Sequence, residues 1–218
     1  MKKVALIVAG GSGSRMASST PKQFLLLKNT PVLMHTIRQF RSFDKIIVVL
    51  PTTKINYWKK LCKETEFPLK HVLTKGGANR FESVKNGLAN ITEQSIVAIH
   101  DGVRPLVSKN LIDKLIQKVK EGVGAVPIIP ITSSVLEINK TGLKHIDRSN
   151  LYKLQTPQCF MFNDIRNAYQ QEYSDFFTDD SSVFNNTTGY KITSVLGERK
   201  NIKITTKEDL TIAESFIQ

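Results

Sequence analysis

The amino-acid sequence predicts an α/β fold: a doubly wound, mainly parallel sheet with helices on both faces. Short runs rich in Val and Ile, with little alternation of polar residues, indicate strands that are buried on both faces. Between these runs lie stretches in which apolar residues recur every three or four positions, as in amphipathic helices. Because the two patterns alternate along the chain, parallel strands joined by helices are favoured.

The predicted strands and helices follow one another in a regular order. The strands cover residues 3–8, 45–50, 71–73, 96–100 and 125–129. A helix after the second strand has one apolar face, formed by Ile55, Trp58, Leu61 and Cys62. A helix after the fourth strand has another, formed by Leu111, Leu115 and Val119.

A predicted hairpin interrupts this order. Residues 135–138 and 143–146 are typical of two short strands, and Asn139 and Gly142 are residues that tight turns favour. A hairpin inserted in an α/β sheet often projects from the body, and an isolated one is only marginally stable. We therefore expect a β-arm at about residues 132–153 that packs on a second subunit, within a single domain of residues 1–218.

Composition and charge exclude several classes of protein. The 218 residues are 40% hydrophobic, as in globular proteins, and no apolar run is long enough to cross a bilayer. A net charge of +12 favours anionic ligands, but the lysines are scattered, which argues against a nucleic-acid-binding module. Cys62 and Cys159 lack metal-ligand spacing and are typical of free thiols, so we expect a cytoplasmic protein.

The first candidate site is a glycine-rich loop that directly follows the first strand. It reads Ala9-Gly10-Gly11-Ser12-Gly13-Ser14-Arg15-Met16, with Pro21-Lys22-Gln23 a few residues later. Ligands of such sheets bind at the carboxyl ends of strands, where glycines let backbone amides approach phosphate oxygens. The loop is neither a P-loop nor a dinucleotide fingerprint, so by itself it also fits a plain turn. Arg15 and Lys22 favour the phosphate site, because both cations suit the same ligand.

Two further segments follow predicted strands. Residues 76–84 open a helix, and they fit either a helix start with glycines or a loop in which Ser83 and backbone amides contact a base. The second segment is His100-Asp101-Gly102-Val103-Arg104-Pro105. A buried carboxylate needs a partner or a metal. Asp101 therefore either pairs with Arg104 or helps to hold Mg²⁺ on a triphosphate, with Arg104 on a substrate phosphate.

A last group of motifs lies late in the chain, and each places a cation or a hydroxyl beside an apolar element. The motifs are Asp147-Arg148, Gln155-Thr156-Pro157-Gln158 and Asn201-Ile202-Lys203-Ile204-Thr205-Thr206. In this order, all the motifs together resemble the 2-C-methyl-D-erythritol 4-phosphate cytidylyltransferase family over essentially the whole chain. The glycine loop with Pro-Lys-Gln is similar to sugar-phosphate nucleotidyltransferases, and the later motifs narrow the resemblance to the cytidylyltransferase branch.

The resemblance implies a Rossmann-like nucleotidyltransferase fold, a homodimer joined by an exchanged β-arm, and dependence on Mg²⁺. It implies an enzyme that transfers a cytidylyl group from CTP to 2-C-methyl-D-erythritol 4-phosphate, in the non-mevalonate isoprenoid pathway. Ribitol 5-phosphate cytidylyltransferases share the glycine loop, the His-Asp…Arg-Pro cluster and Gln-Thr-Pro-Gln, and are the alternative. A catalytically inactive homologue is disfavoured because Arg15 and Lys22 are both present.

The resemblance also implies roles for individual residues. The implied catalytic residues are Arg15 and Lys22, which stabilise the transition state, and Arg148 and Lys203, which position the acceptor phosphate. The implied nucleotide-binding residues are Ala9, Gly10, Gly11, Ser12, Gly13, Gly77, Ala78, Ser83, Asp101 and Gly102. The implied substrate-binding residues are Asp101, Arg104, Ser134, Arg148, Thr156 and Lys203. Asp101 is also the candidate ligand of the metal ion, which the phosphates of CTP would mainly hold.

Overall fold

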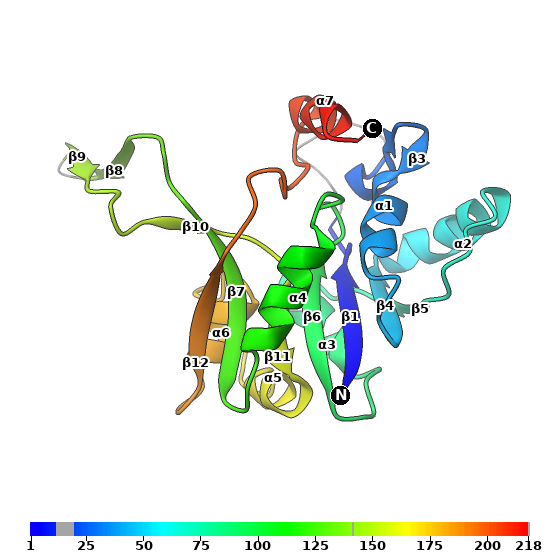
Figure 1. The fold of residues 1–218 in the computed structure, drawn as a ribbon, viewed down its shortest axis with the longest axis horizontal. Coiled ribbons are helices and arrows are strands. Elements are labelled where there is room, and N and C mark those ends of the chain that lie inside the picture. Colours follow the sequence, from blue (N-terminus) through cyan, green and yellow to red (C-terminus); the bar gives the residue numbers. More distant parts are fainter. Residues whose placement is uncertain (12–19, 141, 218) are drawn as a thin grey trace.

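The central feature of the fold is a mixed sheet, shown in Figure 1. The computed structural model describes residues 1–11, 20–140 and 142–217. Within these residues an eight-stranded sheet has the order β10-β7-β11-β6-β1-β4-β5, with β12 also paired to β7. Its strands are β1 (Lys2–Val8), β4 (Lys45–Leu50), β5 (Val72–Lys75), β6 (Ser95–Asp101), β7 (Val123–Pro130), β10 (Tyr152–Leu154), β11 (Gln158–Met161) and β12 (Lys191–Leu196).

The remaining elements connect or flank these strands. The helices are α1 (Val32–Gln39), α2 (Ile55–Glu64), α3 (Arg80–Leu88), α4 (Lys109–Lys118), α5 (Phe162–Ala168), α6 (Asp180–Asn185) and α7 (Lys207–Ser215), with 3-10 turns η2 (Lys22–Phe24) and η3 (Thr52–Lys54). Two small hairpins complete the fold, β2 (Leu26–Leu27) with β3 (Thr30–Pro31) and β8 (Val135–Asn139) with β9 (Gly142–Ile146). Each predicted strand and both predicted helices are present, with boundaries that differ by a few residues at most.

The direction of the strands determines where a ligand can bind. Strands β6, β1, β4 and β5 are parallel neighbours, and the chain places β4 on one side of β1 and returns to place β6 on the other. A doubly wound sheet binds its ligands outside the carboxyl ends of the strands at such a switch point. The predicted mainly parallel sheet is confirmed, while β10 and β11 run antiparallel to β7 and were not predicted.

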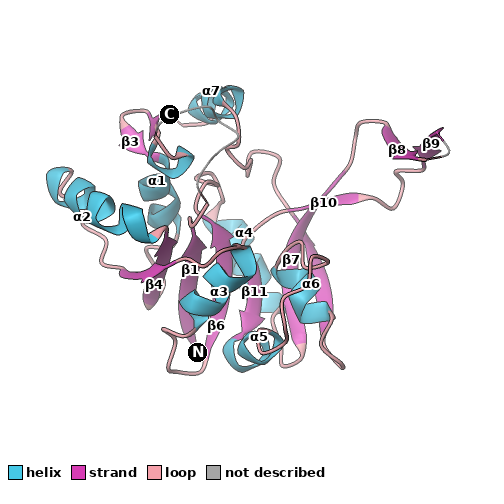
Figure 2. Ribbon diagram, turned by 180° about the vertical axis from the view of Figure 1, so that it is seen from behind, coloured by secondary structure: helices cyan, strands magenta, loops and turns pink. Residues whose placement is uncertain are grey.

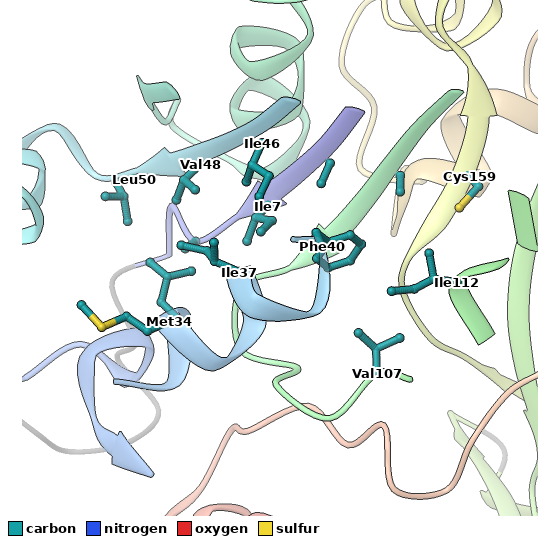
Figure 3. Packing of buried hydrophobic residues seen from close by; sticks show 14 of the residues in the cluster. Ile7, Met34, Ile37, Phe40, Ile46, Val48, Leu50, Val107, Ile112 and Cys159 are labelled. Carbon is teal, nitrogen blue, oxygen red and sulfur yellow. The ribbon is translucent and has the colours of Figure 1, made fainter. Parts of the chain in front are cut away.

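Helices cover both faces of the sheet, as predicted. Residues of α1, α2 and α4 pack in one buried cluster, and residues of α3, α5 and α6 pack in another. Figure 2 shows α3, α5 and α6 on the face turned toward the viewer. In Figure 3, Ile37 of α1 and Phe40, which directly follows α1, lie against Ile7 and Val48 of the sheet. Burial of each such side chain stabilises the folded state by about 1.5–3 kcal/mol. The strands whose ends carry the polar residues are therefore held between two packed layers.

The predicted hairpin is present as β8 paired with β9, within the segment 132–153 that is termed the β-arm. Its strands pair from Val135 opposite Ile146 to Asn139 opposite Gly142, and Figure 1 shows it projecting from the sheet. Residues opposite each other in an antiparallel pair share a face, which places Leu136, Ile138 and Leu143 on one face. They are 46%, 79% and 69% exposed. The arm therefore carries an apolar face that its own chain leaves open to solvent.

Candidate active site

A cleft of about 420 Å³ opens at the carboxyl ends of β1 and β6, at the switch point of the sheet. Its lining brings together residues from both glycine loops, from Pro-Lys-Gln, from the end of β6 and from the late motif. They are Val8, Ala9, Gly10, Gly11, Lys22, Gln23, Gly77, Ala78, Asn79, Arg80, Ser83, Asp101, Val103 and Lys203. Segments far apart in the sequence thus form one site. Ser12, Gly13 and Arg15, which were also predicted to act here, lie outside the described residues.

Ser83 joins the two glycine loops. Its hydroxyl donates to the carbonyl oxygen of Asn79 at 2.8 Å and accepts from the amide of Gly77 at 3.1 Å. A Cβ on Gly10 would lie 3.0 Å from the Ser83 oxygen, so a side chain there would press on this contact. The Asn79 side chain caps α3 by accepting from the amide of Glu82 at 2.9 Å. The predicted role of Ser83 in the nucleotide site thus includes shaping the loop.

Gln23 is a site residue that the sequence analysis missed. Its side-chain amide donates to the carbonyl oxygens of Ala9 at 2.9 Å and Gly11 at 3.3 Å, and it is 1% exposed. These bonds hold η2, and with it Lys22, against the first glycine loop. Gln23 is part of the motif Pro21-Lys22-Gln23, but only Lys22 was predicted as a site residue, because it carries a charge.

Asp101 lies at the centre of a cluster of cations. Its Oδ2 is 3.1 Å from Nε of Arg104 and 3.1 Å from Nζ of Lys203, while its Oδ1 is 3.8 Å from Nε of Arg80. Burial alone would raise the pKa of Asp101, but Lys203, Arg80 and Arg104 outweigh it and hold the pKa well below the ordinary 3.8. Asp101 is therefore ionised at neutral pH, and the predicted ion pair with Arg104 is present.

Arg104 and Thr156 lie behind Asp101 and do not line the cleft. Arg104 is 9% exposed and also donates from Nη1 to the carbonyl oxygen of Asn201 at 2.8 Å. The Thr156 hydroxyl accepts from the amide of Asp101 and contacts Nδ1 of His100, both at 3.0 Å. Since His100 Nε2 lies 3.0 Å from the carbonyl oxygen of Arg104, the neutral ring donates from Nε2 and accepts at Nδ1. Both predicted substrate contacts are thus positioned to support Asp101.

The segment Gln155-Thr156-Pro157-Gln158 orders the surroundings of the site. Gln155 donates to the carbonyl oxygens of Glu198 at 2.8 Å and Asn201 at 3.2 Å, which holds the segment between β12 and Lys203. Gln158 donates to Asp179 at 3.0 Å and accepts from the amide of Ser181 at 2.8 Å, which holds the start of α6. One short motif therefore holds both the segment before Lys203 and the start of α6.

Gly102 is also a packing residue. Its amide donates to the carbonyl oxygen of Val8 at 2.8 Å, and a Cβ at this position would lie 2.7 Å from that of Ala9. Only glycine lets the ends of β1 and β6 come this close. It thereby brings Ala9 and Asp101, two lining residues, to the same edge of the cleft.

Ser134 and Arg148 lie elsewhere, on the β-arm. Both are exposed, neither lines the cleft, and Arg148 donates from Nη1 to the carbonyl oxygen of Thr132 at 2.5 Å. Within one chain, the structure does not bring these two predicted substrate contacts to the other site residues.

The charges of the lining favour an anionic ligand. Among the described lining residues, Lys22, Arg80 and Lys203 are cations and Asp101 is the single carboxylate. The described part of the chain also contains no group of three or more His, Cys, Asp or Glu residues suited to a metal. A metal here would need ligands from a bound substrate.

Glycine loops and a basic cleft at the switch point of a parallel sheet define an α/β nucleotide-binding site. A model of the IspD family, 2-C-methyl-D-erythritol 4-phosphate cytidylyltransferase, matches residues 3–218, and the chain belongs to this family. The resemblance inferred from the motifs is confirmed, and with it the prediction of an enzyme of the nucleotidyltransferase class.

Individual relatives agree with this assignment. The chain is similar to 2-C-methyl-D-erythritol 4-phosphate cytidylyltransferases of Azobacteroides pseudotrichonymphae, with 45% identity over 99% of both chains, and of Phocaeicola vulgatus, with 44% identity over 100% of both. A solved structure of 4-diphosphocytidyl-2C-methyl-D-erythritol synthase from Anaerococcus prevotii has a TM-score of 0.79 at 28% identity, covering 99% of this chain and 97% of that one. These three names carry no support for the ribitol alternative. Among the described residues, no helix is long and apolar enough to span a membrane.

Proposed function

We propose that this protein transfers a cytidylyl group from CTP to 2-C-methyl-D-erythritol 4-phosphate and releases pyrophosphate. The observation that carries the proposal is the cleft in which two glycine loops meet Lys22, Asp101 and Lys203, in a chain that belongs to this family. We place the reaction in the cytoplasm, which the free thiols of Cys62 and Cys159 support.

The chemistry requires two anions to approach each other. An oxygen of the acceptor phosphate attacks the α-phosphorus of CTP and forms a new P–O bond. The bond from this phosphorus to the oxygen bridging to the β-phosphorus breaks, and pyrophosphate leaves with the electron pair. Because the acceptor oxygen is already anionic, no general base is needed, and the protein's task is alignment and charge neutralisation.

Each part of the cleft has a proposed share in this task. The loops around Ser83 and Gly10 hold the nucleotide, with backbone groups toward base and phosphates. Lys22, with Arg15, stabilises the charge that develops on the transferred phosphoryl group and on pyrophosphate. Lys203 binds the acceptor phosphate, and Asp101 accepts hydrogen bonds from substrate hydroxyls.

Asp101 is also the residue proposed to hold Mg²⁺, together with oxygens of the triphosphate. The fit rests on its two oxygens: Oδ2 is shared by Arg104 and Lys203 at 3.1 Å, whereas Oδ1 is 3.8 Å from Arg80 and keeps lone pairs for a hard cation. One or two carboxylates with substrate phosphates are the usual protein ligands of Mg²⁺. When bound, the ion supplies positive charge that neutralises phosphate oxygens.

The β-arm is proposed to exchange between two chains of a homodimer. Its apolar face, Leu136, Ile138 and Leu143, is exposed in the single chain and suits burial against a partner. Ser134 and Arg148 lie on the same arm, away from their own cleft, so they would serve the acceptor site of the neighbouring chain. An arm from one subunit would then complete the other subunit's site.

The experiment that tests the proposed function is pyrophosphate release from a matrix of nucleotides and acceptors. The purified protein is incubated with CTP, UTP, ATP or GTP, and with 2-C-methyl-D-erythritol 4-phosphate, ribitol 5-phosphate or no acceptor. We expect release with CTP and methylerythritol phosphate at a rate well above every other combination. Faster release with ribitol 5-phosphate would assign the chain to the alternative substrate, and no release with any pair would refute the proposal.

A further inference from the structure

A buried ion pair adjoins the cleft but plays no part in the mechanism above. Nη1 and Nη2 of Arg80 donate to the two carboxylate oxygens of Asp180 at 2.7 and 2.6 Å. Asp180 is 0% exposed, and its Oδ1 also accepts from the hydroxyl of Tyr169 at 2.7 Å. The carboxylate is thus fully paired at the first turn of α6, and Asp180 does not itself line the cleft.

The partner of Asp180 is a lining residue with two faces. The forked end of the Arg80 guanidinium points to Asp180, while its Nε lies 3.8 Å from Oδ1 of Asp101. Arg80 is therefore placed between two carboxylates, and it makes short hydrogen bonds to Asp180 but not to Asp101. Bidentate pairing is the strongest geometry that Arg has with a carboxylate.

We propose that Asp180 is a positioning residue for the transfer reaction: by occupying the fork of Arg80, it keeps this cation from capturing Asp101. Asp101, which lines the cleft, then remains shared by Arg104 and Lys203, each at 3.1 Å. Apart from Asp180, Asp101 is the carboxylate among the described residues that forms an ion pair with Arg80, at 3.8 Å. Its capture would displace Lys203 and misalign the acceptor phosphate. This inference rests on the proposed function.

The position of Asp180 is itself built into the site. Gln158, in the motif whose Thr156 supports Asp101, holds the start of α6 through Asp179 and the amide of Ser181. Thr156, which supports Asp101, and Gln158, which holds the residues on both sides of Asp180, are thus two positions apart in one segment.

The test compares Asp180→Asn with the double variant Arg80→Gln/Asp180→Asn, in the full chain and well below each variant's unfolding temperature. We expect Asp180→Asn to lower kcat about 10- to 100-fold, since a small misalignment has effects of this size. Its Kd for CTP, measured by calorimetry, should weaken by no more than about threefold. The double variant should be faster than Asp180→Asn, because no unpaired guanidinium is left to capture Asp101. It should match the single variant Arg80→Gln, because Asp180 acts on the reaction only through Arg80.

The outcomes separate positioning from simple stability. An unchanged kcat in Asp180→Asn, or a double variant as slow as Asp180→Asn, would overturn the proposal. Removing one partner of a buried pair is strongly destabilising, whereas removing both is often neutral. If Asp180→Asn does not fold, the double variant is compared with Arg80→Gln: equal kcat supports the proposal, and a double variant about tenfold or more slower contradicts it.

Two further measurements complete the design. Asp113→Asn removes the same kind of carboxylate from the exposed pair with Lys109, 2.7 Å apart on α4, and should leave kcat unchanged. A crystal structure of Asp180→Asn should show the Arg80 fork on Asp101, and a fork left in place would refute the mechanism. This readout needs no activity. An inactive wild-type protein would refute the proposed function, whereas an active wild type with an unaffected Asp180→Asn variant would refute this inference alone.

Discussion

The hydroxyl of Thr156 accepts a hydrogen bond from the backbone amide of Asp101 at 3.0 Å, although 55 positions separate the two residues in the chain. The same hydroxyl lies 3.0 Å from Nδ1 of His100. A residue before β11 thereby fixes the carboxyl end of β6. The carboxylate at the centre of the cleft thus depends on a side chain that does not itself line the cleft.

Replacing Thr156 by valine should therefore affect both stability and turnover. Valine keeps the shape and removes the hydroxyl, which leaves the buried amide of Asp101 without its acceptor. Such a loss costs about 1–3 kcal/mol, and the freed strand end should also lower kcat. Thermal unfolding and steady-state kinetics measure the two effects. Thr156→Ser retains the hydroxyl and is the matched control. A valine variant with wild-type stability and kcat would show that these bonds are dispensable.

Lys22 and Arg15 should act on the rate far more than on binding. Lys22→Ala and Arg15→Ala should each lower kcat by about 10²–10³, the usual effect of losing one transition-state donor. The KM for CTP should rise much less, because the glycine loops still bind the nucleotide. Lys59→Ala removes an exposed cation of α2 and should change neither constant. Near-normal kcat in either test variant would remove that residue from the mechanism.

Acid should destabilise the protein through His100. Burial lowers the pKa of His100 from 6.5 to about 4, so the unfolded chain binds a proton there more readily than the folded one. Stability is therefore fully present above about pH 6.5 and falls as the pH drops toward 4. Because each pKa unit corresponds to about 1.4 kcal/mol, the free energy of unfolding should fall by an amount on the order of 3 kcal/mol.

Urea unfolding between pH 4 and 7 measures this dependence. His100→Gln should flatten the curve in that range, since the titrating group is gone. His145→Gln, which removes an exposed histidine of the arm, should leave the curve unchanged. An equally steep curve in His100→Gln would assign the acid sensitivity to other groups.

Local patterns predicted much of the fold, because a strand buried on both faces needs a run of apolar residues. The boundaries of β4 match the prediction at both ends, and Asn139 with Gly142 located the hairpin. Strand β11 was not predicted because its sequence, Gln158-Cys159-Phe160-Met161, lacks the Val and Ile typical of the other strands. The pairing of strands that are distant in the sequence was also not predicted, since a single sequence does not show which distant segments lie side by side.

The candidate site was predictable to a similar extent. Lys22, Asp101 and Lys203 were singled out from charge and motif, and the structure brings them to one cleft. The supporting bonds were not predictable: Gln23 is uncharged, and Asp180 is 100 positions from Arg80. Such residues act through geometry that only the folded chain defines.

The apolar face of the β-arm should hold the proposed dimer together. Ile138→Asp/Leu143→Asp places two charges on this face, and burying them against a partner would be costly. We expect sedimentation velocity to show monomers with little activity, whereas the wild type sediments as a dimer. Glu137→Ala/Lys144→Ala alters the opposite face of the same hairpin and should leave the dimer intact. A test variant that remains dimeric would place the interface elsewhere.

Arg148 and Lys203 should govern the acceptor and not the nucleotide. Arg148→Met and Lys203→Met remove one cation each and keep a long side chain, so both should lower kcat about 10²-fold through a misplaced acceptor phosphate. Calorimetric affinity for CTP should change little, since Lys22 and the glycine loops remain. Lost CTP binding with intact acceptor kinetics would mean that the residue serves the other substrate.

The same two variants also test whether the arms are exchanged. In the proposed dimer, each site combines Lys203 of one chain with Arg148 of its neighbour. When the two variants are coexpressed, a mixed dimer contains one site with both lesions and one site with neither. Random pairing in a two-fold dimer should therefore restore about a quarter of wild-type activity. If each arm served its own chain, every site would carry one lesion and the mixture would be as inactive as its components.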